Sequence, residues 1–162
     1  MNKTDKKICC PEFDPSSWEG KTVIFEDKLF VKNTTPQFLH MPLPGTIGKM
    51  VTKSWAEMEA AGARPANQDF LWLAYDPSPW KCEHYFHVTH EVPGLTNVKL
   101  SGTFITKVFD GPFNHVPKWI KEMDAYLASQ NKKAAKYYFY YTTCPKCAKK
   151  YGHNYVVIFA EI

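Results

Sequence analysis

Residues 38–58, FLHMPLPGTIGKMVTKSWAEM, and residues 104–123, FITKVFDGPFNHVPKWIKEM, share one plan. Each segment begins with a phenylalanine, reaches Gly45 or Gly111 seven residues later, and continues into an amphipathic pattern that ends with Trp, Glu and Met. Two strand-like runs rich in aromatic residues follow each segment. Such a repeat indicates a duplicated structural unit. Two small sheets placed side by side form a cleft, and clefts are where small molecules bind.

The hydrophobic periodicity assigns the elements. Apolar residues recur every three or four positions over 46–61 and again over 115–130, which predicts two amphipathic helices. Gly62 is suited to end the first helix. Strands are predicted at 22–32 (one or two short strands), 37–41, 69–76, 83–92, 98–109, 136–142 and 154–162. The segment 143–153, TCPKCAKKYGH, is expected to be a connecting loop.

The order strand–helix–strand–strand therefore occurs twice. It predicts an α+β fold with antiparallel sheets, helices on one face and a ligand cleft between two modules, at about 30–95 and 96–162. Residues 1–20 are expected to form an irregular arm, and residues 21–162 a single domain.

Composition excludes several functions. With 20 basic and 16 acidic residues the net charge is +4, too small to indicate nucleic-acid binding. The sequence has no long apolar run that would predict a membrane span, and its first residues, MNKTDKKICC, lack the apolar core of a secretory signal. We expect a cytoplasmic protein, a monomer, with reduced thiols and no cofactor.

Aromatic residues make up 15% of the chain, and their placement on strands is informative. In 154–162 the positions Val156, Ile158 and Ala160 form an aliphatic face suited to pack on a helix, while Tyr155 and Phe159 lie on the other face. Other strands also combine rings on one face, and one such face carries Glu83. Rings and a carboxylate together favour flat, apolar, often cationic ligands. The predicted ligand-binding residues are Trp72, Trp80, Tyr138, Tyr140, Tyr155 and Phe159.

The cysteines leave three alternatives open. Cys144 and Cys147 form a CxxC motif, and Cys9 and Cys10 supply two further thiols. The motif is compatible with zinc, with a labile disulfide or redox pair, and with plain reduced thiols, and no residue is assigned as a metal ligand. His84, His87 and His90 do not predict a metal site, because His87 points to the opposite face of the strand from the other two.

The segment VFDGPFNHVPKWIKEMDAYLASQ resembles the GyrI-like small-molecule-binding domain, and the likeness covers roughly residues 30–162. The turn Gly111-Pro112-Phe113 is its most specific part. Motifs CCPEFDP, SPWKCE and CPKCAKKYG are similar to those of a bacterial subgroup labelled only as hydrolases. The resemblance implies a pocket between the modules, lined by aromatic residues and a glutamate, that takes bulky apolar or cationic compounds.

The resemblance also implies that some stand-alone members hydrolyse strained electrophiles such as cyclopropanoid natural products, using a glutamate with Tyr and Trp. The matching positions here are Glu83, Tyr85, Trp72 and Trp80. One departure is Val156-Val157, which stands where family members often carry Thr-Glu.

Three functions follow as hypotheses. The first is multidrug-type binding, in which Glu83 acts as a countercharge. The second is hydrolysis, in which Glu83 has a pKa raised by burial and acts as general base, while Tyr85 or Tyr140 donates to the developing anion. The third is a zinc-dependent interaction through Cys144 and Cys147.

Overall fold

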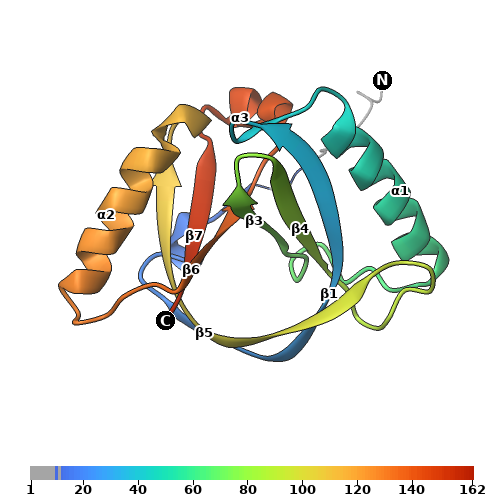
Figure 1. Cartoon of the computed structure of the whole chain (residues 1–162), viewed down its shortest axis with the longest axis horizontal. Helices are drawn as coiled ribbons and strands as arrows, with labels where there is room; N and C mark the ends of the chain where they lie inside the picture. Colours follow the sequence, from blue (N-terminus) through green and yellow to red (C-terminus); the bar gives the residue numbers. More distant parts are fainter. Residues whose placement is uncertain (1–9, 11) are drawn as a thin grey trace, which may run out of the picture.

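The strand–helix–strand–strand order occurs twice, as predicted, in a computed structural model that describes residue 10 and residues 12–162 (Figure 1). The fold is α+β. The first module comprises β1 (Thr22–Phe38), α1 (Thr46–Ala60), β3 (Trp72–Ser78) and β4 (Lys81–His87), and the second β5 (Asn97–Asp110), α2 (Val116–Ala128), β6 (Lys136–Tyr141) and β7 (Tyr155–Glu161). The remaining elements are β2 (Met41–Pro42), α3 (Pro145–Tyr151) and the 3₁₀ turns η1 (Pro15–Ser17) and η2 (Phe113–His115).

The strands form one antiparallel sheet that closes on itself. Its order is β2-β1-β4-β3-β6-β7-β5, and an additional pairing of β1 with β5 completes the ring. The first half of β1 pairs with β5, starting at Thr22↔Ile105, and the second half pairs with β4, ending at Pro36↔Lys81. The two modules also meet at β3 and β6, where the register is given by Ala74↔Phe139. The junction between β3 and β6 is short in comparison with the long β1–β5 ladder, and it is here termed the seam of the barrel.

β1 is longer than the sequence predicted. The separate strands expected at 22–32 and 37–41 are replaced by a single strand that ends at Phe38. Its ladder with β5 shifts between Phe25 and Lys28, and Asp27 has a φ of 49°. A bulge of this kind bends a strand without ending it, which lets β1 serve both modules.

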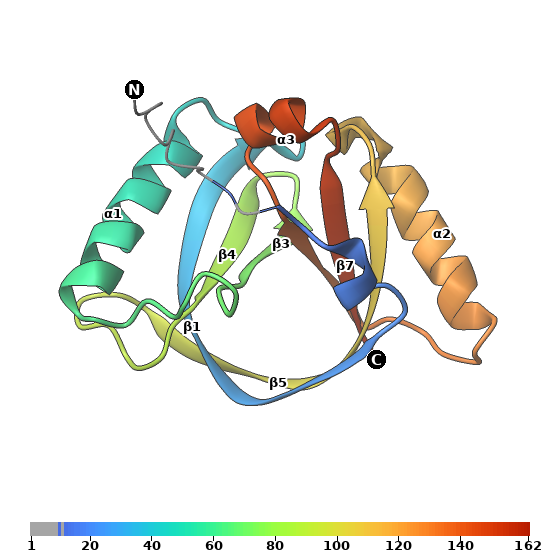
Figure 2. The same cartoon turned by 180° about the vertical axis from the view of Figure 1, so that it is seen from behind.

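Other predicted boundaries were wrong as well. The strand expected over 69–76 is observed as Trp72–Ser78, and the strand expected to begin at 83 begins at Lys81. The strand expected over 83–92 ends at His87, because the backbone N–H of Thr89 donates to the carbonyl of Ala63 at 2.9 Å instead of continuing the ladder. The loop expected over 143–153 contains the helix α3, which ends at Tyr151 and is capped by Gly152 with a φ of 73°. α3 lies at one end of the barrel, between α1 and α2 (Figure 2).

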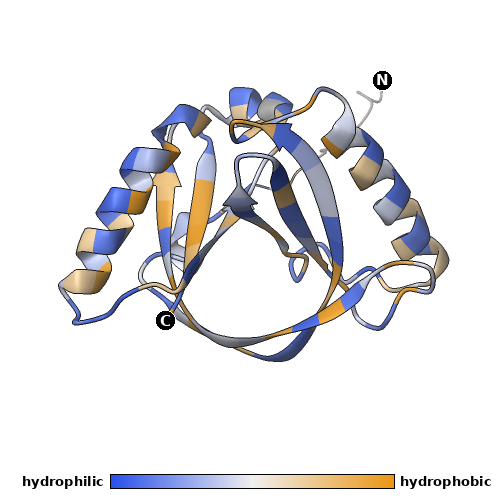
Figure 3. Cartoon of the chain, viewed as in Figure 1, coloured by the Kyte–Doolittle hydropathy of each residue, from blue (hydrophilic) through white to orange (hydrophobic). Residues whose placement is uncertain are grey.

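Helices cover the outer face of the sheet. The aliphatic positions Val156, Ile158 and Ala160 of β7 are fully buried and pack in one cluster with Trp119 and Met123 of α2. This confirms the prediction that this face is covered by a helix. Figure 3 shows the hydrophobic strand beside α2, whose exposed side is hydrophilic. α1 covers β1 and β4 in the same way, through a cluster of its own that includes Met58.

The inner face of the barrel forms a second, aromatic core. Its buried members are Phe25, Phe30, Leu71, Leu73, Tyr85, Phe104, Tyr138, Val157 and Phe159. These side chains fill the opening that the ribbons leave in Figure 1. The alternation of side chains along each strand thus separates an inner ring-rich core from an outer helix-covered face.

The repeated glycines have a common role at the strand-to-helix turns. Gly45 precedes α1 with a φ of 77°, and Gly111 precedes η2 and α2 with a φ of 149°. Both values favour glycine. At Gly111 space is also short, because an added Cβ would lie 3.3 Å from Nδ1 of His115 and 3.4 Å from the ring of Trp119. The feature that revealed the repeat is therefore the turn that starts each helix.

Among the described residues, no helix is long and apolar enough to span a membrane.

Candidate functional site

A cavity of about 2090 Å³ lies on the outer face of the sheet, between the two modules. α1 and α2 stand at opposite sides of the barrel, so neither covers the seam between β3 and β6 (Figure 1). Residues from both modules line the cavity. The lining includes Ile47, Val51 and Trp55 of α1, Trp72, Ala74 and Asp76 of β3, Phe139 and Tyr141 of β6, and Val116 and Ile120 of α2.

A buried hydrogen-bonded chain fixes one ring of the cavity wall. Nε1–H of Trp72 donates to Nδ1 of His84 at 3.1 Å, and Nε2 of His84 lies 2.9 Å from Oγ1 of Thr35. Because Nδ1 accepts this hydrogen bond and so carries no proton, Nε2 is the protonated nitrogen of the neutral ring and donates to Oγ1 of Thr35. Burial lowers the pKa of His84 to about 4, so the ring is neutral at pH 7. The hydrogen bonds of His84 to Trp72 and Thr35 therefore hold the Trp72 ring in one orientation.

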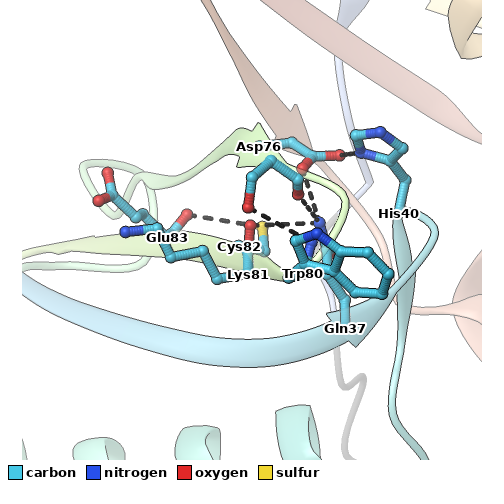
Figure 4. Close-up of polar contacts among 8 residues, drawn as sticks. Gln37, His40, Asp76, Trp80, Lys81, Cys82 and Glu83 are labelled. Atoms are coloured by element: carbon cyan, nitrogen blue, oxygen red, sulfur yellow. Dashed lines mark hydrogen bonds and ion pairs between the residues drawn. The ribbon is translucent and has the colours of Figure 1, made fainter.

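A polar group lies at the rim of the cavity, where Asp76 is held by two side chains (Figure 4). Nε2–H of Gln37 donates to Oδ1 of Asp76 at 2.6 Å, and Nδ1–H of His40 donates to Oδ2 at 2.7 Å. Gln37 is buried and also donates to the carbonyl of Ser78 at 2.9 Å. The Asp76 and His40 side chains are 32% and 54% exposed, so both are accessible from the cavity.

The backbone at His40 is unusual. Leu39 and His40 have φ values of 48° and 65°, a region that non-glycine residues adopt at a cost of about 1–3 kcal/mol. The short pairing of β2 with β1, Phe38↔Met41, forces this turn. The turn brings His40 to Asp76, which lies 36 positions further along the chain.

The structure divides the predicted site residues between the two faces of the sheet. Of the predicted rings, Trp72 lines the cavity from the outer face, and Tyr140 borders the cavity although its ring packs against the inner core. Tyr138 and Phe159 belong to the inner core, and Tyr155 is half-buried beside Phe13, with ring centroids 5.6 Å apart.

The remaining predicted ring, Trp80, is 60% exposed. Its nearest ring partner is Phe38, at a centroid distance of 5.7 Å, and it is not part of the cavity lining.

Glu83 and Tyr85 lie on the inner face, away from the cavity lining. Oε1 of Glu83 is 3.1 Å from Nζ of Lys32, and the hydroxyl of Tyr85 donates to Oε2 at 2.7 Å. Burial by itself would raise the pKa of Glu83, but the bonds from Tyr85 and Lys32 outweigh it and the pKa is lowered. The expectation of a raised pKa was therefore wrong, and the physical reason is the hydrogen bond from Tyr85 together with the ion pair with Lys32. The catalytic roles of Glu83 and Tyr85 stay predictions.

Sequence reasoning missed most of the rings that line the cavity. Trp55, Phe70, Phe139 and Tyr141 line it, as do His40 and Asp76. One signal was available for the rings. Phe139 and Tyr141 alternate with the inner-face residues of β6 and so lie on the helix side, which two helices cannot cover completely. The pairing of His40 with Asp76 left no trace in the sequence.

Thiols gather beside the cavity. The Sγ atoms of Cys10, Cys144 and Cys147 all lie within 4.8 Å of one another, and Cys10 and Cys144 line the cavity. Burial raises the pKa of the Cys10 thiol to about 12. Cys82 stands apart on β4, where burial followed by the charges of Asp76 and Glu83 raises its pKa to about 12. The predicted participation of Cys9 lies outside the described residues.

These features define a class of small α+β proteins in which two fused modules enclose a ring-lined cavity. A family described as "Bacterial hydrolase" matches residues 1–162, the full length of the chain. The chain belongs to this bacterial hydrolase family. The curated proteins contain no match to the sequence.

Solved structures share the fold. An uncharacterised conserved protein from Listeria innocua superposes with a TM-score of 0.63 at 9% identity, covering 88% of this chain and 91% of the other. A hydrolase encoded by lin2189 from Listeria innocua superposes with a TM-score of 0.59 at 8% identity, with coverage of 88% and 91%. The structure of SAV2435 bound to tetraphenylphosphonium reaches a TM-score of 0.46 at 11% identity, covering 88% and 93%. The likeness to the two Listeria innocua structures, at 9% and 8% identity, shows the fold alone.

Proposed function

We propose that this protein binds bulky, largely apolar aromatic molecules in the cavity between its modules. The observation that carries the proposal is the cavity itself, which measures about 2090 Å³ and is lined by Trp55, Trp72, Phe139 and Tyr141. Ligand sites commonly measure about 300–1,000 Å³, so this one has room for a molecule of several rings. The resemblance to GyrI-like domains supports the same kind of ligand.

The acids that line the cavity favour a cationic ligand. Asp76 of β3 and Glu12 of the arm present carboxylates to it, whereas Glu59 of α1 is paired with Arg64. The lining also contains Lys136, whose ammonium lies over the ring of Tyr75. Aromatic faces attract cations as well, with about 0.5–2 kcal/mol for each favourable contact. Asp76 thus takes the countercharge role that the sequence assigned to Glu83.

The binding proposal is tested with a matched pair of tryptophan variants. We expect the cationic dye rhodamine 6G to bind the wild-type protein, and Trp72→Ala to weaken binding about tenfold or more, because one stacking face is lost. Trp80→Ala removes an exposed ring outside the cavity and is expected to leave the Kd unchanged. Equal affinities of the two variants, or no binding of the dye, contradict the proposal.

A second candidate is hydrolysis in the same cavity, and the pair formed by His40 and Asp76 favours it. Histidine is the side chain best suited to accept a proton near neutral pH, and a carboxylate bonded to Nδ1 leaves Nε2 as the accepting nitrogen. We propose that Nε2 of His40 takes a proton from a water molecule whose oxygen bonds to a ring carbon of a cyclopropanoid substrate. The strained ring bond breaks in the same step, and its electron pair passes to the electron-accepting group of the substrate and is then protonated. The hydrolase family of the chain supports this reading.

Turnover and binding separate the two candidates. With a cyclopropanoid substrate, His40→Asn and Asp76→Asn are expected to reduce kcat about 100-fold or more, since general base catalysis contributes about 10²–10⁴. Glu83→Gln is the comparison, because Glu83 is the alternative general base and lies on the inner face of the sheet, whereas Asp76 lies on the outer face. If Glu83→Gln abolishes turnover while His40→Asn retains it, the base is Glu83 and the assignment to His40 is refuted. If the protein binds the dye but turns over no cyclopropanoid substrate, only the binding function remains supported.

A further inference from the structure

Three cysteines converge where the N-terminal arm crosses α3. Cys10 comes from the arm, Cys144 from the residue preceding α3, and Cys147 from its first turn. Their Sγ atoms lie within 4.8 Å of one another, and Cys147 is 5% exposed. These residues, here termed the three-cysteine cluster, join positions of the chain that are 134 residues apart.

The surrounding contacts hold the cluster together. The backbone N–H of Cys144 donates to Sγ of Cys10 at 3.4 Å, and the hydroxyl of Tyr151 donates to the carbonyl of Cys10 at 2.9 Å. Further along the arm, the ring of Phe13 packs on Tyr140 at a centroid distance of 6.2 Å. The thiols are therefore brought together by contacts of Cys10 itself and of the arm that follows it, and their approach is part of the fold.

We propose that the three-cysteine cluster binds a zinc ion, which fastens the N-terminal arm to α3. Zinc prefers thiolates in tetrahedral geometry with Zn–S distances of about 2.3 Å, which places sulfurs about 3.8 Å apart. The three Sγ atoms lie within 4.8 Å of one another, so small side-chain rotations would bring them to the spacing that zinc requires. The fourth position of the ion is left for a water molecule or another donor.

The geometry favours a metal over the alternatives. A disulfide uses two sulfurs about 2.05 Å apart and leaves the third without a role, whereas all three converge here. A CxxC motif supplies two of the ligands in many zinc sites, and Cys10 adds a third thiol here. A zinc ion with three thiolates carries one negative charge, and the exposed Lys146, Lys149 and Lys150 of α3 supply positive charge nearby.

The three-cysteine cluster forms part of the cavity wall. Cys10, Cys144 and Tyr151 belong to the cavity lining, so a metal at the cluster fixes that part of the wall. Binding of a metal to the folded state alone stabilises it by mass action, so loss of the ion is expected to loosen the arm first. The zinc proposal does not depend on which molecule the cavity holds.

The experiment measures metal content and ligand chemistry in the whole protein. Protein purified without a histidine tag or chelator, under reducing conditions, is expected to hold about one zinc per chain by mass spectrometry of the elements. Cobalt reconstitution of the metal-free protein is expected to give thiolate-to-cobalt charge-transfer bands and tetrahedral d–d bands. Cys10→Ser and Cys147→Ser are expected to lose zinc and these bands.

Cys82→Ser is the matched control, because Cys82 lies outside the cluster, and it is expected to retain the metal. The cobalt spectrum of the wild-type protein tests the proposal even where a cluster variant does not fold. Three results overturn the proposal: no stoichiometric zinc after incubation with the ion, zinc that persists in both cluster variants, or an intact mass that shows a disulfide within the cluster under reducing conditions.

Discussion

The buried imidazole of His84 makes the stability of this protein depend on pH. In the unfolded chain a histidine has a pKa of about 6.5, whereas burial lowers the pKa of His84 to about 4 in the folded state. Above pH 6.5 both states hold a neutral ring. As the pH falls from 6.5 towards 4 the unfolded state takes up a proton that the folded state excludes, so the free energy of unfolding decreases. Between pH 7 and pH 5 the loss is about 2 kcal/mol.

His84→Gln isolates this contribution. Glutamine does not titrate, and its amide can keep the bond to Thr35, while the bond from Trp72 is lost. The variant is expected to be less stable than wild type at pH 7, and to lose about 2 kcal/mol less between pH 7 and pH 5. Urea unfolding followed by tryptophan fluorescence measures both quantities, because comparing each protein with itself removes the constant cost of the substitution.

His115→Gln serves as the control, since His115 is exposed and its replacement is expected to leave the pH dependence unchanged. The reasoning is refuted if wild type and His84→Gln lose the same free energy over this range. Such a result would mean that His84 is protonated in the folded state at pH 5, and that its exclusion from water is incomplete.

Three further predictions concern stability. Phe86→Ala removes a side chain with 0% exposure from the cluster under α1 and is expected to cost about 3–5 kcal/mol in urea unfolding, whereas Trp80→Ala, with 60% exposure, should change stability by less than about 0.5 kcal/mol. Gly111→Ala is expected to lower Tm, at a cost of about 1–3 kcal/mol, because of its φ of 149° and the Cβ contact with His115; an unchanged Tm would contradict this account of the turn. The lowered pKa of Glu83 stabilises the fold above its unfolded pKa, so Glu83→Gln should lower stability at pH 7 and flatten the acid limb below pH 4.5; parallel acid limbs would count against the ion pair with Lys32.

Much of the fold was predictable because periodicity and duplication are local signals. The helix predicted over 46–61 is observed as Thr46–Ala60, and the repeat correctly gives the same element order twice. The closure of the barrel was not predictable. It depends on the bulge near Asp27, which keeps β1 continuous, and on the pairing of its first half with β5. Neither produces a hydrophobic pattern different from that of two short strands.

The candidate site was predictable only in part. Alternation along β6 and β7 separated the two faces of the sheet correctly, because side chains in a strand alternate whatever the tertiary fold. Which face stays open depends on where the helices stop covering it, and that is a property of the assembled modules. The rings chosen for binding included Trp72 and Tyr140, which line the cavity, while Phe159 proved to be core. His40 and Asp76 meet through a tight turn at β2, whose left-handed residues have no distinctive sequence.

The pairing of β1 with β5 has a consequence for biosynthesis. The chain leaves the ribosome from its N-terminus, so Thr22–Phe25 appears long before its partners, Gly102–Ile105. The second half of β1 can pair with β4 earlier, because β4 precedes β5 in the chain. Until β5 is available, the first half of β1 has unpaired backbone groups, and the side chains of Val23 and Phe25 are not yet covered by the second module. An exposed strand edge of this kind is open to pairing with another nascent chain. The first half of β1 therefore stays exposed until β5 has emerged from the ribosome and can pair with it.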